Sequence, residues 1–159
     1  MLKPPTSQQA FVIVRDIDAP VSRVFEQLTS EAGMKAWVPL CRSAQWQHPK
    51  GARGPGVDSV RDIRLHGGII AAERMVAWDP GRELHYSFDA TTLPVAALTR
   101  GYVGVTRIEA RGAGTSRLHW AIHFDSPGPL ALLRPLVIAS LQPLVATMAG
   151  RLKRLSEQR

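Results

Sequence analysis

The chain has 159 residues, of which 45% are hydrophobic and 21% charged. This composition fits one globular domain and excludes a disordered or fibrous protein. Cys41 is the single cysteine, which excludes an internal disulfide framework and is typical of a reducing compartment. Because no charged-then-apolar signal segment opens the chain, we expect a cytoplasmic protein. The net charge is +7, but the basic residues are mostly scattered and accompany no DNA- or RNA-binding motif, so we expect no nucleic-acid partner.

The N-terminal part of the chain is predicted to contain a leader, one strand and two short helices. Residues 1–9 are polar and carry two prolines, so we expect a flexible leader before a single domain over residues 10–159. Alternating apolar and polar residues predict a strand over Phe11–Asp18. Pro20 favours the start of a helix whose apolar face consists of Val21, Val24, Phe25 and Leu28. Ser30 is a suitable cap for a second helix that ends near Trp37.

Short strands separated by turn signals follow these helices. Six are predicted, at Ser43–His48, Val57–Leu65, Ile69–Trp78, Glu83–Ala90, Tyr102–Ala110 and Thr115–Asp125. Their close spacing and their glycine- and proline-containing connections favour an antiparallel meander. The loop Gly51–Gly56 is interpreted either as a flap at the mouth of a cavity or as a plain surface loop.

The chain ends in a long predicted helix that begins near Pro129. Its apolar residues recur at spacings of three and four, at Val137, Leu141, Leu144, Met148, Leu152 and Leu155. Only the sheet is large enough to cover this stripe. Leu130–Gly150 has nearly the length of a membrane span, but it is interrupted by Arg134, Pro135, Gln142 and Pro143. A buried amphipathic helix is therefore favoured, and contact with a membrane surface is the alternative. Positive charge suits the end of this helix, where Arg151, Lys153, Arg154 and Arg159 cluster.

This order of elements resembles the START-like or helix-grip superfamily (SRPBCC, Bet v 1-like). Sequence landmarks are similar to those of its polyketide cyclase/dehydrase and lipid-transport branch: Ile17–Phe25, Trp37–Pro39, Gly54–Val57, Glu73 with Trp78–Pro80, and Gly114–Trp120. The resemblance implies an α+β helix-grip fold, in which a curved antiparallel sheet wraps around the C-terminal helix and encloses a deep apolar cavity. It does not imply a reaction, because members of the superfamily bind, carry or transform different ligands on the same frame.

Strand parity predicts which side chains face this cavity. In the last strand, Trp120 and Phe124 belong to the face under the helix, whereas His119 and His123 belong to the opposite, solvent-facing side. A two-residue turn at Pro80-Gly81 would pair Asp79 with Arg82 and set Tyr86 opposite Met75. Residues that are directly opposite share a face, so Glu73 and Met75 would also point inward.

The connection before Ile69 decides where Arg61 points. A two-residue turn at Gly67-Gly68 would turn several polar groups inward: Asp58, Asp62, Arg64 and His66. A three-residue turn over His66–Gly68 instead turns Arg61, Ile63 and Leu65 inward and is favoured on burial cost. It places Arg61 almost opposite Glu73. These two residues then form a structural ion pair or orient the polar end of a ligand.

The residues expected to bind a ligand come from the inward strand faces, the second helix and the last helix: Trp37, Arg61, Glu73, Met75, Tyr86, Tyr102, Trp120, Phe124, Leu141, Leu144 and Met148. No cofactor or metal is expected, because the five histidines lack metal-ligand spacing and no glycine-rich loop precedes a helix.

Binding of an apolar small molecule, such as a lipid, quinone or polyketide-like compound, is the favoured function. A polyketide cyclase/dehydratase-type enzyme would need acid/base groups in the same cavity, and such groups are available at Arg61, Glu73, Tyr86 and Tyr102. A protein-interaction module is a third reading, supported by the outward positions expected for Arg74, Val76 and Trp78. Peripheral membrane contact and a homodimer remain open.

Overall fold

The computed structural model describes residues 2–158, with these elements: β1 Gln9–Ile17, α1 Val21–Thr29, α2 Glu31–Trp37, β2 Cys41–Gln47, β3 Val60–Leu65, β4 Ile70–Asp79, β5 Glu83–Thr91, α3 Val95–Leu98, β6 Arg100–Gly112, β7 Thr115–Asp125, a 3-10 helix η1 Gly128–Leu133, and α4 Arg134–Glu157. Met1 and Arg159, expected in the leader and in the C-terminal basic cluster, lie outside the described residues. The predicted order of one strand, two short helices, six strands and a long C-terminal helix is confirmed. The short helix α3 was not predicted.

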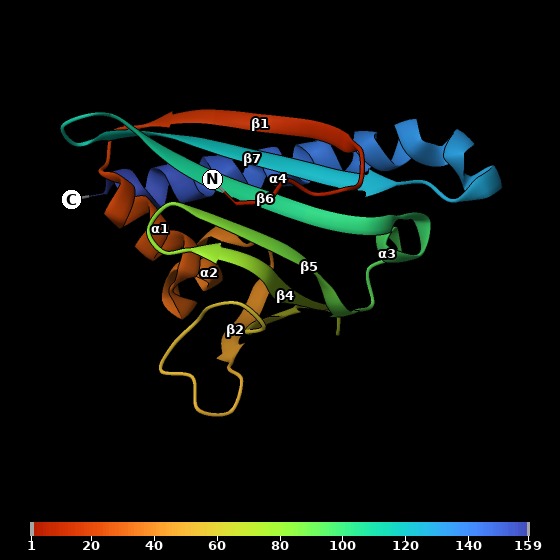
Figure 1. Ribbon diagram of the computed structural model, residues 1–159, viewed down its shortest axis with the longest axis horizontal. Helices are drawn as coiled ribbons and strands as arrows, with labels where there is room; N and C mark the ends of the chain where they lie inside the picture. The colour runs from red at the N-terminus through yellow and green to blue at the C-terminus, as the bar shows by residue number, and fades with distance from the viewer. Residues whose placement is uncertain (1, 159) are drawn as a thin grey trace.

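The seven strands form one antiparallel sheet in the order β1-β7-β6-β5-β4-β3-β2, and this sheet curves over α4 (Figure 1). Strands β2 to β7 pair with their neighbours in sequence, whereas β1 pairs with β7 at the far edge. Helices α1 and α2 pack against α4 at one end of the sheet. The α+β helix-grip fold expected from the resemblance is therefore confirmed.

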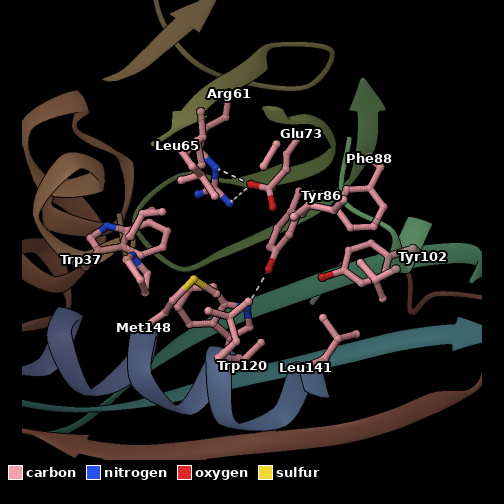
Figure 2. Close-up of a pocket in the computed structure, with 18 residues that line it drawn as sticks. Trp37, Arg61, Leu65, Glu73, Tyr86, Phe88, Tyr102, Trp120, Leu141 and Met148 are labelled. Atoms are coloured by element: carbon pink, nitrogen blue, oxygen red, sulfur yellow. Dashed lines mark hydrogen bonds and ion pairs between the residues drawn. The ribbon is translucent and has the colours of Figure 1, made fainter. Parts of the chain in front are cut away.

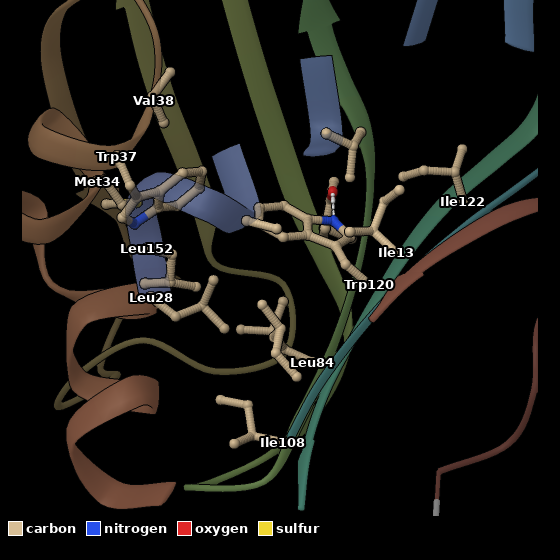
Figure 3. Close-up of a cluster of buried hydrophobic side chains, with 14 of the residues drawn as sticks. Ile13, Leu28, Met34, Trp37, Val38, Leu84, Ile108, Trp120, Ile122 and Leu152 are labelled. Carbon is tan, nitrogen blue, oxygen red and sulfur yellow. Dashed lines mark hydrogen bonds between the residues drawn. The ribbon is translucent and has the colours of Figure 1, made fainter. Parts of the chain in front are cut away.

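The inward faces of the strands form a continuous apolar core with the helices (Figure 3). Leu118, Trp120, Ile122 and Phe124 of β7 are each at most 1% exposed, so the parity predicted for this strand is correct. The rings of Trp37 and Trp120 meet edge to face, with centroids 5.5 Å apart. Trp37 is placed at the end of α2, a helix that Ser30 caps by accepting a hydrogen bond from the Gly33 amide at 3.1 Å.

Helix α4 buries only the side that faces the sheet. Its buried residues are Val137, Leu141, Val145, Ala149, Leu152 and Ser156. The predicted stripe is thus displaced by one residue at three of its six positions, and Leu144 lies at the margin with 40% of its surface exposed. By length and composition, Gly128–Glu157 could cross a membrane; its most apolar 18-residue window has a mean hydropathy of 1.6, and 17% of that window is buried. The expectation of a buried amphipathic helix therefore holds for one side of α4 only.

The β3–β4 connection has the predicted length. Leu65 N donates to Ile69 O, which leaves His66, Gly67 and Gly68 as the three-residue turn. Both glycines have positive φ, of 83° and 78°, a conformation that glycine adopts without strain. Arg61 consequently lies directly opposite Glu73, as predicted.

The β4–β5 connection differs from the prediction. Asp79 pairs with Glu83 and not with Arg82, because the turn contains three residues. A bulge between Met75 and Ala77 compensates for the extra residue, so Met75 still lies opposite Tyr86. The same bulge turns Trp78 inward, where its ring contacts those of Phe25 and Trp46 at centroid distances of 5.5 and 5.9 Å. The expected outward position of Trp78 is therefore wrong.

Two terminal or loop segments also differ from expectation. The end of the leader is held against the sheet: Ser7 Oγ donates to Gly101 O at 2.7 Å, and Gln8 N donates to an Asp125 carboxylate oxygen at 3.1 Å. The loop Gly51–Gly56 does not line the cavity described below, which favours the interpretation as a plain surface loop. Its place at the rim is taken by the segment that contains α3.

Candidate functional site

A cavity of about 100 Å³ lies between the inner face of the sheet and α4 (Figure 2). Of the residues predicted to bind a ligand, it is lined by Trp37, Arg61, Glu73, Tyr86, Tyr102, Trp120, Leu141, Leu144 and Met148. Less buried residues form its rim, among them Pro39, Leu93, Val95 and Leu144. Sites for drug-sized ligands usually measure about 300–1,000 Å³. The enclosed space therefore holds one ring-sized group, and a larger ligand must extend through the rim.

Met75 and Phe124 face inward but do not line the cavity. Met75 is 0% exposed and is enclosed by the core. Phe124 lies near the end of β7, where the Arg134 guanidinium covers its ring at 4.6 Å and Arg134 Nη1 donates to the Phe124 carbonyl at 2.6 Å. The predicted inward face is correct for both residues, but the cavity does not extend to them, because parity identifies the face of a strand and not the distance along it.

Arg61 and Glu73 form a buried ion pair in the cavity wall. Nε and Nη2 of Arg61 donate to the same carboxylate oxygen of Glu73, at 2.8 and 2.5 Å. The Arg61 side chain is 1% exposed and that of Glu73 is 13% exposed. The Arg61 guanidinium carbon also lies 4.9 Å from the Tyr86 ring centroid and 5.6 Å from that of Trp37. Carboxylate and rings together hold the guanidinium in one orientation.

One nitrogen of this guanidinium, Nη1 with its two N–H groups, is left without a partner. Among residues 2–158, no group forms a hydrogen bond with Arg61 Nη1, although this atom is buried. Buried polar groups are nearly always hydrogen-bonded in native proteins. Within residues 2–158, Nη1 is therefore the one buried side-chain nitrogen or oxygen of the cavity-lining residues that has no hydrogen-bond partner of any kind.

Tyr86 and Tyr102 bring two hydroxyl groups to the same cavity. Tyr86 Oη accepts a hydrogen bond from Trp120 Nε1 at 2.8 Å, and the Tyr102 ring stacks on Phe88 at 4.1 Å. Burial, and secondarily the negative charge of Glu73, raises the pKa of Tyr86 well above its usual value. Burial, and then the neighbouring Tyr86, likewise raises the pKa of Tyr102. Both phenols thus stay protonated at neutral pH and do not serve as bases.

Alkaline titration should reveal these shifted phenols directly, because the chain has only two tyrosines. We expect almost no phenolate absorbance near pH 10, where a free tyrosine is half ionised. Since the folded-state pKa values lie above the unfolded ones, the unfolded chain binds fewer protons above pH 10. Stability should therefore be unaffected by these groups below about pH 10 and should fall as the pH rises further. A reversible phenolate signal near pH 10 from the folded protein would contradict this expectation.

Gly104 creates the space that the Tyr86 ring occupies. It lies directly opposite Tyr86 in the β5–β6 pairing. A Cβ atom at this position would lie 2.1 Å from Tyr86 Cζ and 2.4 Å from Tyr86 Oη. Sequence reasoning did not identify Gly104, although a glycine inside a predicted strand often marks a close approach of this kind.

The outer face of the sheet carries a separate polar cluster. Glu83 is 1% exposed and accepts hydrogen bonds from Arg107 Nε at 2.9 Å, and its other oxygen lies 2.7 Å from His85 Nε2. His119 and His123 share this face, as parity predicts, but they are half-buried beside the N-terminal segment and not fully solvent-facing. Within residues 2–158, no three His, Cys, Asp or Glu side chains are grouped as a metal site.

The curved sheet, the long helix and the apolar cavity between them define a helix-grip protein. A family model described as polyketide cyclase/dehydrase and lipid transport matches residues 8–157, and the chain belongs to this family. An uncharacterised protein of Mycobacterium tuberculosis is 25% identical over 132 residues, which are 80% of this chain and 74% of that protein.

Similar folds occur among solved structures. Bacillus cereus XoxI has a TM-score of 0.67 at 18% identity, and the match covers 91% of this chain and 92% of that one. TTHA0849 of Thermus thermophilus has a TM-score of 0.65 at 20% identity, with 91% and 94% covered. The Aha1 dimer of Colwellia psychrerythraea has a TM-score of 0.66 at 14% identity, with 92% and 95% covered. At these identities, the likeness concerns the fold alone.

Proposed function

We propose that this protein binds a hydrophobic small molecule in the cavity between the sheet and α4. The observation that carries the proposal is an apolar cavity whose wall holds one buried, oriented ion pair, Arg61–Glu73. Binding sites for apolar ligands commonly combine apolar walls with a few fixed polar groups that orient the ligand. The family membership supports the same reading.

The polar groups of the cavity favour binding over catalysis. Glu73 supplies the only carboxylate that the described part of the chain, residues 2–158, contributes to the cavity lining, and Arg61 holds one of its oxygens with two donors. The two phenols have raised pKa values, so neither supplies a base at neutral pH. A cyclase or dehydratase would need a group that takes up a proton close to the substrate. The carrier or sequestering role therefore has the better support.

Binding in the cavity can be tested with N-phenyl-1-naphthylamine, an uncharged dye that becomes fluorescent in apolar surroundings. Ala71 lines the cavity, and its replacement by leucine would fill part of the enclosed space. We expect Ala71→Leu to weaken dye binding by about tenfold, equivalent to about 1.4 kcal/mol. Ala139→Leu, at an exposed position of α4, is the matched control and should bind like the wild type.

Two outcomes would count against the proposal. Equal dye affinity in Ala71→Leu and the wild type would place the dye outside the cavity. No binding to the folded wild-type protein, together with no apolar compound in an organic extract of the purified protein, would reject the proposed function. Thermal unfolding of each variant verifies that the fold is retained.

We also infer that η1 and the first turns of α4 contact a membrane surface. Leu132 and Leu136 are 88% and 66% exposed, and this end of the helix extends beyond the sheet (Figure 1). No Asp or Glu occurs between Ser126 and Ser156, so nothing in this segment repels an anionic lipid. Leu136 and Leu144 are both exposed on α4, about two turns apart along the helix and about 80° apart around its axis. Leu144 belongs to the cavity rim, so the exposed surface lies near that rim.

Co-sedimentation with phosphatidylcholine vesicles, with and without phosphatidylglycerol, tests this contact. The double change Leu132→Asp and Leu136→Asp should abolish sedimentation, because two carboxylates would enter the interface. Gln142→Asp, on another exposed side of α4, should leave it unchanged. Unaltered sedimentation of the double variant would contradict the inference. A dimer in the wild type that the double variant loses would assign the surface to a second copy of the chain.

A further inference from the structure

We propose that the ligand presents an uncharged oxygen acceptor, a ring-borne ketone or quinone carbonyl, to Nη1 of Arg61. This inference rests on the proposed function and specifies the chemistry of the group that enters the cavity. The observation behind it is the buried Nη1 donor, for which the described part of the chain supplies no acceptor.

The direction of this donor is fixed before any ligand binds. Glu73 occupies Nε and Nη2 of Arg61, and the Tyr86 and Trp37 rings flank the guanidinium carbon (Figure 2). Because a guanidinium is planar, holding one edge also sets the direction of Nη1. A ligand acceptor that reaches Nη1 would therefore gain a charge-assisted hydrogen bond without turning the guanidinium.

The partner of Nη1 must accept a hydrogen bond and must carry no net charge. Arginine has donors only, so an ammonium or amide N–H of a ligand finds no partner there. Among residues 2–158, Arg61 and Glu73 are the only charged side chains that line the cavity, and their charges cancel. A ligand carboxylate would add a second anion near Glu73 with no second cation, in a largely apolar space. A carbonyl oxygen avoids this cost.

The shape of the enclosed space favours a flat ring at the carbonyl end. Half of the chain's aromatic residues line the cavity: Trp37, Tyr86, Phe88, Tyr102 and Trp120, out of four Trp, two Tyr and four Phe. The enclosed volume of about 100 Å³ is ring-sized. The rim residues Leu93, Val95 and Leu144 are aliphatic. A ligand with a ring and its carbonyl in the aromatic interior, and an alkyl substituent at the aliphatic rim, fits this change from aromatic to aliphatic lining.

Three naphthalenes of nearly equal shape test the inference through their displacement of N-phenyl-1-naphthylamine: 2-acetylnaphthalene, 2-isopropenylnaphthalene and 2-naphthoate. The first offers a neutral carbonyl, the second has no acceptor and the third is anionic. We expect the ketone to bind the wild type at least about tenfold more tightly than either of the others. In the double variant Arg61→Met with Glu73→Leu, which leaves no unpaired charge, the ketone and the hydrocarbon should bind equally well.

The other possible results of this displacement experiment contradict either the carbonyl inference or the proposed function. Equal binding of ketone and hydrocarbon to the wild type would mean that water satisfies Nη1 and would overturn the inference while leaving the proposed function intact. Tightest binding of naphthoate would overturn it in favour of an anionic ligand. A ketone preference that persists in the double variant would assign the carbonyl to another residue. No binding of any probe, the dye included, together with no apolar compound in an organic extract of the purified protein, would reject the proposed function itself.

A second measurement does not depend on the variant. The infrared C=O stretch of carbonyl-labelled 2-acetylnaphthalene should shift to lower frequency when the ketone is bound to the wild type, because a charge-assisted hydrogen bond weakens the C=O bond. A stretch like that in a hydrocarbon solvent would overturn the inference even if the double variant does not fold.

Discussion

Replacing Arg61 with methionine, or Glu73 with leucine, should lower the free energy of unfolding by about 3–5 kcal/mol, whereas replacing both together should cost far less. Each single change strands the other charge in the cavity wall, where the Arg61 side chain is 1% exposed and that of Glu73 is 13% exposed. The double change leaves two apolar side chains and no unpaired group. Arg61→Met leaves the Glu73 carboxylate unpaired, and because this group is the more exposed of the two, we expect the destabilisation by Arg61→Met to lie toward the lower end of this range.

Urea unfolding of the two single variants and the double variant measures this coupling directly. Arg64→Met is a matched control, because Arg64 lies on the same strand and pairs with Asp62 but is 47% exposed. We expect this control to change the free energy of unfolding by less than about 1 kcal/mol. A double variant that is as unstable as the sum of its single changes would show that the pair is not coupled as its geometry indicates.

The same double variant separates the two readings of the ion pair that the sequence leaves open. If Arg61 and Glu73 are purely structural, a stable double variant should still bind whatever apolar compound co-purifies with the wild type. If they orient the polar end of the ligand, the variant should fold but bind that compound poorly. The unsatisfied Nη1 of Arg61 favours the second reading, because a purely structural pair leaves no reason for a buried donor without an acceptor.

Turn length could be predicted where a wrong choice carries a large burial cost. At His66–Gly68, a two-residue turn would have buried several charged side chains, so the correct three-residue turn followed from the sequence. At Pro80-Gly81 no such cost separates the alternatives, and the predicted turn was one residue too short. The pairing of Met75 with Tyr86 was nevertheless right, because the bulge at Val76 cancels the error.

Strand periodicity could not predict which inward-facing side chains reach the cavity, nor which residues are covered by segments distant in the sequence. Parity placed Met75 and Phe124 on the correct face, but whether such a residue meets the cavity or solid core depends on where α4 crosses the sheet. Helix α3 has four residues and buries none of them, so it leaves no periodic signal in the sequence. The covering of His123 comes from Ser7, more than 100 residues away in the chain, whose carbonyl lies 3.3 Å from the ring.

Gly104→Ala should be the second change with a large effect, at about 3 kcal/mol or more of lost unfolding free energy. A Cβ atom 2.1 Å from Tyr86 Cζ cannot be accommodated, so the ring must move. The move breaks the hydrogen bond from Trp120 Nε1 to Tyr86 Oη and disturbs the ring that flanks Arg61. Gly150→Ala is the matched control, because nothing lies within 4 Å of a Cβ there. In the middle of α4 it should stabilise the protein by about 0.5–1 kcal/mol.

The steric origin of this effect can be tested by removing the ring. Tyr86→Ala should itself be destabilising, by about 3–5 kcal/mol, as other large-to-small core changes of aromatic residues are. Adding Gly104→Ala to it should then cost almost nothing, since the atoms that the new methyl group would meet are gone. Additive losses would instead assign the cost to the backbone of β6. With Tyr86 present, the displaced ring borders the cavity and is expected to move into it, so Gly104→Ala should also weaken binding of N-phenyl-1-naphthylamine. Undiminished dye binding would mean that the ring moves elsewhere and that Tyr86 is not part of the binding wall.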